Sequence, residues 1–243
     1  MVEMKAKSAF CAVAMAFLAA CGGGGSGGPI TVTNADPQGI WQGTSNSGQA
    51  VSTLVLETGQ YFAVYSTNNV VGGMVEGTLS VSGNSITDNS ASDFVVGGPG
   101  LAAIVTGTVT TKQLLSATVK ESAKTVTFNG AYDAAYDSSP SLSQAVGTWT
   151  GSSAGSPDIT SITVAADSTF TGTSGSCTFS GSVKPRATGK NVLDGTVTFK
   201  SSACALGNGT SIEFESFFSG SQMIAAGVDS SRMGGFVFVG TKS

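Results

Sequence analysis

The feature that most constrains the fold is a tryptophan motif that occurs twice. The sequence GIWQG at residues 39–43 recurs as GTWTG at 147–151, and these motifs hold the only two tryptophans in the chain. Each motif opens a segment of about a hundred residues, and EGTLSV at 76–81 has a counterpart in SGSV at 180–183. A polar, proline-containing stretch at 137–141 separates the two segments. We therefore expect two copies of one domain joined by a linker.

Within each copy, apolar residues alternate with polar ones, which is the period of a β-strand with one buried face. Turn residues separate these segments at short intervals, and no sustained helical period follows residue 30. The alternating pairs of the first copy are Leu54 and Leu56, Phe62 and Val64, Leu79 and Val81, and Val126 and Phe128. Those of the second copy are Ile162 and Val164, Val197 and Phe199, Ile212 and Phe214, and Phe236 and Phe238.

The expected fold class is all-β, with two small antiparallel meander barrels in tandem. Closing each meander into a barrel removes the exposed edges of strands that are rich in Val, Ile and Thr. About eight strands give a barrel that is filled by its own side chains or that holds one small ligand. Whether each interior is filled or open is the point on which function depends.

The motif glycines and tryptophans, Gly39 and Trp41 and then Gly147 and Trp149, resemble the G-x-W opening of calycin barrels such as lipocalins and avidins. In that family the tryptophan closes the base of the barrel and often stacks under a cationic residue of the last strand. The resemblance implies this role for Lys242 in the second copy, with Arg232 as the less well placed candidate. The first copy has no cation near its last strand, at 130–133. The further tryptophans that line the biotin pocket of avidins are absent from this chain.

The N-terminus has the pattern of an export signal. Lys5 and Lys7 precede a short apolar run, Phe10–Ala20, which is too short for the roughly 20 residues of a membrane-spanning helix. The run ends in Leu18-Ala19-Ala20-Cys21, which resembles the lipobox of bacterial lipoproteins. The resemblance implies cleavage before Cys21, a diacylglycerol on its thiol and an acyl chain on its new amine. Gly22, in place of an aspartate, implies sorting to the outer membrane and leaves open which face the protein occupies.

These features divide the chain into four expected parts. Residues 1–20 form the signal peptide, 21–36 the lipidated cysteine with a glycine-rich linker, 37–140 the first barrel domain and 141–243 the second. About 15 flexible residues have a root-mean-square reach near 20 Å. The membrane is thus a predicted partner through the lipid on Cys21, and the linker leaves the first barrel free to reorient.

Composition excludes one class of partner and points to a difference between the copies. Charged residues make up 11% of the chain and the net charge is −4, so the basic surface that nucleic acids require is missing. The one basic cluster, KPRATGK at 184–190, is interpreted as a solvated hairpin loop. Residues 37–140 carry 3 basic and 7 acidic side chains, whereas 141–243 carry 6 of each. The difference suggests that at most one copy binds something specific.

Two cysteines remain after the signal peptide and the lipidated residue are set aside. Cys177 and Cys204 of an exported chain are expected to form one structural disulfide. The closed loop of 28 residues predicts roughly 3.6 kcal/mol of stabilisation on the chain-entropy model. The first copy has no such bond.

Residues with catalytic or metal-binding patterns are scarce. The chain has no histidine, which removes the usual general base and the commonest zinc ligand. The G-x-S-x-G matches at 24–28 and 151–155 lack the strand-to-helix context of a nucleophile elbow. Glu213 and Glu215 are interpreted as the solvent side of a strand, and Asp88–Asp93 as a polar loop. Two groups of side chains at the end of the first copy fit either an exposed edge or an inter-domain contact: Tyr132 with Tyr136, and Asp133 with Asp137.

No catalytic residue, cofactor or metal ligand is therefore predicted. The expected function is that of a non-enzymatic binding or interaction module of the bacterial envelope, with an unknown protein or small molecule as partner. The alternative is a carrier that holds a small apolar ligand inside one barrel.

Replacement of Cys21 tests the predicted anchor. In the Cys21→Ala variant no lipid can be attached, and the protein is expected to leave the membrane fraction for the soluble fraction of lysed cells. Cys11→Ala is the matched control, because Cys11 lies inside the signal peptide and is removed with it. Unchanged membrane fractionation of the Cys21 variant would refute lipidation.

Overall fold

The structure is a computed structural model, and it describes residues 33–95, 99–154, 156 and 158–243. Val32–Ser243 form one compact unit. The predicted signal peptide, Cys21 and most of the glycine-rich linker lie outside the described residues. Within the described part of the chain, no helix is long and apolar enough to cross a membrane.

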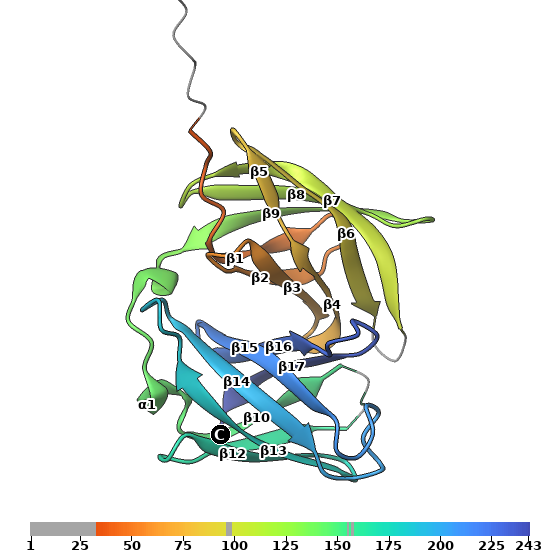
Figure 1. Ribbon diagram of the computed structural model, residues 1–243, viewed down its shortest axis with the longest axis vertical. Helices are drawn as coiled ribbons and strands as arrows, with labels where there is room; N and C mark the ends of the chain where they lie inside the picture. Colours follow the sequence, from red (N-terminus) through yellow and green to blue (C-terminus); the bar gives the residue numbers. More distant parts are fainter. Residues whose placement is uncertain (1–32, 96–98, 155, 157) are drawn as a thin grey trace, which may run out of the picture. The chain divides into compact units, whose positions relative to one another are not determined.

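The first motif opens a closed antiparallel barrel (Figure 1). β1 to β4 pair in sequence order, as do β5 to β9; β9 returns to β1, and β4 pairs with β6 to complete the ring. β5 is a short strand that continues β4 along the same edge of β6. The strands are β1 Gly39–Ser45, β2 Ala50–Val55, β3 Gln60–Thr67, β4 Val70–Thr78, β5 Ser80–Ser82, β6 Ser85–Val95, β7 Gly100–Thr110, β8 Leu114–Lys120 and β9 Thr125–Asp133.

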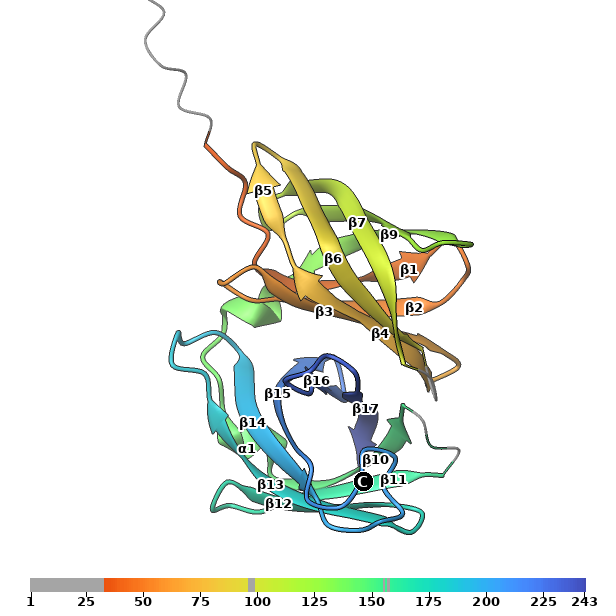
Figure 2. The same ribbon diagram turned by 45° about the vertical axis from the view of Figure 1, so that its right-hand side comes forward.

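The second motif opens a second closed antiparallel barrel of eight strands (Figure 2). Two short helices, η1 Ala134–Asp137 and α1 Leu142–Ala145, connect the barrels. The strands are β10 Gly147–Ser153, β11 Thr160–Val164, β12 Thr169–Ser174, β13 Cys177–Pro185, β14 Val192–Phe199, β15 Ser211–Ser219, β16 Gln222–Val228 and β17 Gly235–Lys242. The predicted fold, two tandem eight-stranded barrels, is confirmed.

The two motif tryptophans occupy matching places. Trp41 is fully buried and its Nε1 donates to the carbonyl of Pro37 at 2.9 Å; Nε1 of Trp149 donates to the carbonyl of Ala145 at 2.7 Å. Lys242 is paired with Trp149 across the β10–β17 ladder, and its Nζ lies 5.3 Å from the centre of the indole ring, as expected. Opposite Trp41 stands Tyr132, with its ring edge-on to the indole at 5.2 Å. The same position thus covers both tryptophans, with different chemistry.

The first glycine of each motif is required by this cover. Gly39 has φ of 155° and Gly147 has φ of 125°, a region that side chains other than glycine rarely adopt. A Cβ on Gly39 would lie 2.5 Å from the ring of Tyr132, and one on Gly147 would lie 2.9 Å from Cε of Lys242. The motif therefore supplies the tryptophan and, through its first glycine, the space that the covering side chain occupies.

Strands on one side of each barrel are buried on both faces. In the first barrel, the side chains of Trp41, Val51 and Val55 point inward. Leu54, on the other face of β2, points outward and is equally buried. The outward residues join those of the second barrel in one apolar cluster: Ile40, Leu54, Leu56, Phe62, Val64, Val71, Met74, Phe94 and Tyr136 with Val192, Phe217, Ile224, Ala226, Val237 and Val239. An apolar interface between the barrels is thus a second core.

This cluster decides two points that the sequence left open. The pairs Leu54 and Leu56, and Phe62 and Val64, are buried as predicted, but they line the inter-barrel cluster and not the inside of a barrel. Tyr136 is fully buried in the same cluster, which settles its role as an inter-domain contact. Alternation shows that the two faces of a strand differ, and it cannot tell an inner core from an outer one.

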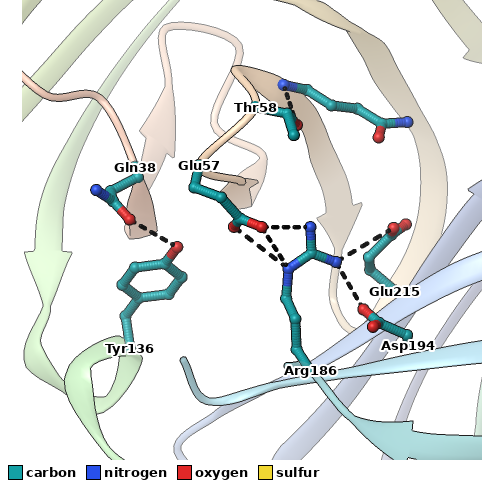
Figure 3. Close-up of polar contacts among 8 residues, drawn as sticks. Gln38, Glu57, Thr58, Tyr136, Arg186, Asp194 and Glu215 are labelled. Carbon is teal, nitrogen blue, oxygen red and sulfur yellow. Dashed lines mark hydrogen bonds and ion pairs between the residues drawn. The ribbon is translucent and has the colours of Figure 1, made fainter. Parts of the chain in front are cut away.

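Charged groups surround the cluster. Arg186 donates to Glu57 of the first barrel and pairs with Asp194 of the second, with its side chain only 13% exposed (Figure 3). Lys190 and Lys112 both bind Asp137 in η1. The interpretation of residues 184–190 as a solvated hairpin loop was therefore wrong for two of its side chains. Arg186 contacts the first barrel, and Lys190 contacts the connection between the barrels.

The predicted disulfide is confirmed. Cys177, at the start of β13, is bonded to Cys204, in the loop that follows β14. The bond therefore ties that loop to the second barrel.

Truncation of Phe217 tests the second core. Phe217 lies on the outer face of β15 and is fully buried, so Phe217→Ala should lower the free energy of unfolding by about 3–5 kcal/mol. Leu114→Ala, at a side chain that is 46% exposed, is the control and should cost less than about 1 kcal/mol. Urea unfolding measures both; equal losses would contradict the packing described.

Candidate functional site: the interior of the first barrel

The insides of the barrels are best compared along one row of directly paired residues. Because strands tilt in a closed barrel, such a row climbs from the base, marked by the tryptophan, toward the other end, the mouth. In the first barrel the row is Trp41, Thr53, Ala63, Val75 and Asp93. In the second it is Trp149, Ile162, Gly172, Phe179 and Phe199.

The second barrel is filled. Its interior holds five phenylalanines whose neighbouring ring centres lie 5.7 to 6.2 Å apart: Phe170, Phe179, Phe199, Phe214 and Phe236. Gly172 makes room for this packing, since a Cβ there would lie 2.2 Å from the ring of Phe179. The cavity among Phe170, Phe214 and Phe236 measures about 20 Å³, too little for any ligand larger than a water molecule.

The first barrel is open. Ala63 and Val75 replace the glycine and phenylalanine that fill the second barrel, and Phe128 is the one phenylalanine among the residues that line the interior. A cavity of about 70 Å³ remains, walled mainly by valine, leucine and isoleucine. It is roughly half of the 150 Å³ that holds a benzene ring, so it suits a narrow chain better than a ring system.

Polar side chains gather at the mouth of this cavity. Tyr65, Asp93, Glu121 and Lys124 all line it, from β3, β6 and the β8–β9 turn. Oη of Tyr65 donates to Oδ1 of Asp93 at 2.7 Å. Gly73 permits this contact, because a Cβ there would lie 2.3 Å from Oη of Tyr65. The phenol is therefore aimed at the carboxylate by the local backbone.

The carboxyl of Asp93 is electrostatically unusual. Asp93 is 3% exposed, and burial raises its pKa to about 6. Glu121 adds to the rise through its charge and through a hydrogen-bonding contact with Asp93, while Tyr65 and Lys124 oppose it. The mouth thus brings two carboxyl groups together with the exposed side chain of Lys124.

Thr53 places a second polar group deeper in the cavity. Its side chain lines the interior between Trp41 and Ala63, and the residue is 4% exposed. Within the described residues, its Oγ1 has no hydrogen-bond partner. A buried hydroxyl without a partner costs about 1–3 kcal/mol, and the matching position of the second barrel holds the apolar Ile162.

The interpretation of Asp88–Asp93 as a polar loop was wrong. These residues lie in β6, where the register shifts between Asp88 and Ala91. Asp88 accepts from Ser90, from the amide of Thr78 and from Tyr61, so its carboxylate supports the irregular strand. Asp93, beyond the bulge, faces the cavity.

The other sequence candidates do not assemble into a site. Glu213 is exposed as predicted, whereas Glu215 faces Arg186 at 3.9 Å and burial raises its pKa to about 7. The hydroxyl of Ser153 is hydrogen-bonded to the hydroxyl of Thr160. Within the described residues no three His, Cys, Asp or Glu side chains form a metal-binding group.

A larger hollow of about 630 Å³ lies at the end of the second barrel where β10 ends and β13 begins, and Phe179, Phe199 and Phe236 of the interior line it together with Phe94, Ser153 and Ser174. The hydroxyls of Ser153, Thr160 and Ser174 satisfy one another there. Its lining flanks residues 96–98, 155 and 157, which lie outside the described part of the chain. We assign no site to it.

No family model, no curated protein and no solved structure matches this chain.

Replacement of Glu121 tests the electrostatics of the mouth. Glu121→Gln removes one cause of the raised pKa of Asp93 and should move its titration midpoint from about 6 toward the usual value near 3.9, as followed by carboxyl ¹³C NMR. Lys124→Met removes an opposing charge and should raise the midpoint. An unchanged midpoint in both variants would contradict the geometry.

The same shift predicts how stability depends on pH. Since the pKa of Asp93 is raised on folding, its contribution to stability is complete below about pH 4 and is lost as the pH rises through 6. The Glu121→Gln variant should therefore lose less stability between pH 4 and pH 7 than the unaltered protein.

Proposed function

We propose that this protein is a non-enzymatic binding module of the bacterial envelope, tethered to the outer membrane through lipid on Cys21, and that its first barrel takes a small, mainly apolar ligand. The observation that carries the proposal is the contrast between the two interiors. One fold, repeated in one chain, has a core filled by five phenylalanines in one copy and an apolar cavity with a polar mouth in the other.

The placement of polar groups supports binding over a merely imperfect core. A poorly packed core would leave an apolar void, but this cavity receives Thr53 and Asp93 at positions where the second barrel has Ile162 and Phe199. Buried polar groups cost stability unless they are paired. Their presence at the wall of the cavity is consistent with partners supplied by a ligand.

The second barrel then serves as a support. Its filled interior and its disulfide make it a rigid body, and its outer face packs against β1–β4, which form one wall of the ligand cavity. The arrangement holds that wall in place from outside.

A transplant of the filling pair tests the proposal. The variant Ala63→Gly with Val75→Phe gives the first barrel the residues that fill the second, Gly172 and Phe179. It should keep its stability and lose binding of n-butanol, a narrow apolar probe, because the ring occupies the cavity. The chain from Gly22 to Ser243, exported through an ordinary signal peptide, is suitable, since Val32–Ser243 form one compact unit.

Methyl NMR of the lining valines measures this binding. The reciprocal change, Phe179→Val, is the matched control. It opens space in the second barrel, and the substitution by itself should leave the methyl shifts of the first barrel unchanged. If butanol moves no methyl resonance of the first barrel in the unaltered protein, the cavity does not bind and the proposal fails.

A further inference from the structure

We infer that the ligand of the first barrel is a short-chain primary amine, with its ammonium group between Asp93 and Glu121 at the mouth and its chain in the apolar cavity. This inference rests on the proposed function and names the chemical class that the same site selects.

The charge of the mouth selects a cation. Asp93 and Glu121 both line the mouth of the cavity, together with Lys124 and with Tyr65, whose hydroxyl donates to Asp93. An ammonium group placed between two carboxylates relieves their mutual repulsion and makes charge-assisted hydrogen bonds. A carboxylate ligand would add a third negative charge, so the mouth disfavours it.

Burial makes this recognition effective. Asp93 is 3% exposed, and its attraction for a cation is little screened by water. Lys124 is exposed at the rim, so its ammonium group can remain in solvent while a ligand occupies the mouth. Tyr65 donates to one oxygen of Asp93 and holds the carboxylate in a fixed orientation.

The cavity and Thr53 define the rest of the ligand. The volume of about 70 Å³ accommodates a short unbranched chain, and the wall around it is apolar. Thr53 lies next to Trp41 at the base and lines the cavity, and among the described residues nothing pairs with its Oγ1. A chain that carries a hydroxyl or a second amine at its inner end would satisfy this group.

Four probes with the same chain length separate the contributions: n-butanol, n-butylamine, butyrate and 4-amino-1-butanol. At pH 8 we expect butylamine to bind at least about tenfold more tightly than butanol, from charge-assisted hydrogen bonds. Aminobutanol should bind more tightly again, and butyrate most weakly. NMR titration of the Gly22–Ser243 chain gives all four dissociation constants.

Variants assign the effect to residues. Glu121→Gln should reduce the preference for butylamine over butanol by about tenfold, and Lys124→Met should increase it. Thr53→Val, which keeps the shape of the side chain, should remove the advantage of aminobutanol over butylamine and leave butylamine itself unaffected. Butanol binding serves as the internal control in every variant, because its apolar chain reports the cavity alone.

The outcomes keep the two proposals apart. If butanol and butylamine bind equally and Glu121→Gln changes neither, the cavity binds ligands without selecting amines, and this inference falls while the proposed function stands. A preference for butyrate would also overturn it. If none of the four probes shifts the lining methyls, the proposed function fails and this inference fails with it.

Discussion

The packing of the two barrels against each other is the interaction on which the rest of the structure depends. Leu54, Phe62 and Met74 from the first barrel meet Phe217 and Ile224 from the second in one buried cluster. Burial of such side chains is worth about 1.5–3 kcal/mol each. By contrast, a cavity of about 70 Å³ costs roughly 2 kcal/mol at about 24 cal/mol per Å³. The free energy gained by burial in the inter-barrel cluster therefore exceeds the cost of leaving the first barrel open.

This division explains why the copies differ although they share a fold. Under the proposed function, no ligand has to enter the second barrel, which can therefore fill its interior and carry a disulfide. The first barrel has no disulfide, and it has Val75 where the second has Phe179, whose ring packs over Gly172. Its stability is then supplied from outside, by the face that the second barrel covers.

The sequence predicted the fold because each of its signals was local. Alternation located the strands, the motif glycines and tryptophans located the repeat, and two cysteines located the disulfide. The inter-barrel core was not predicted, because the period of two that joins Leu54 to Leu56 and Phe62 to Val64 is the same whether these residues face inward or outward. Arg186 was misread for a related reason: its partner Glu57 is 129 residues away in the chain.

The site was also out of reach, although one signal was present. Asp93 follows a run of small polar residues that is typical of loops, and the bulge that keeps this run within β6 depends on Asp88 meeting Tyr61 and Thr78 from other strands. The usable signal was phenylalanine, which occurs three times in residues 37–140 and eight times in 141–243. That difference already separated an open interior from a filled one.

The chain enters the first barrel at the end opposite to the mouth of the cavity. Residues 34–36 bond to Gly83 and Thr111, in turns at the same end of the barrel as Gly39 and Trp41. The mouth, with Asp93, Glu121 and Lys124, lies at the opposite end of the strands. Residues 34–36 thus pack at the closed base of the first barrel, and the mouth of its cavity is at the far end of the same strands, where these residues do not cover it.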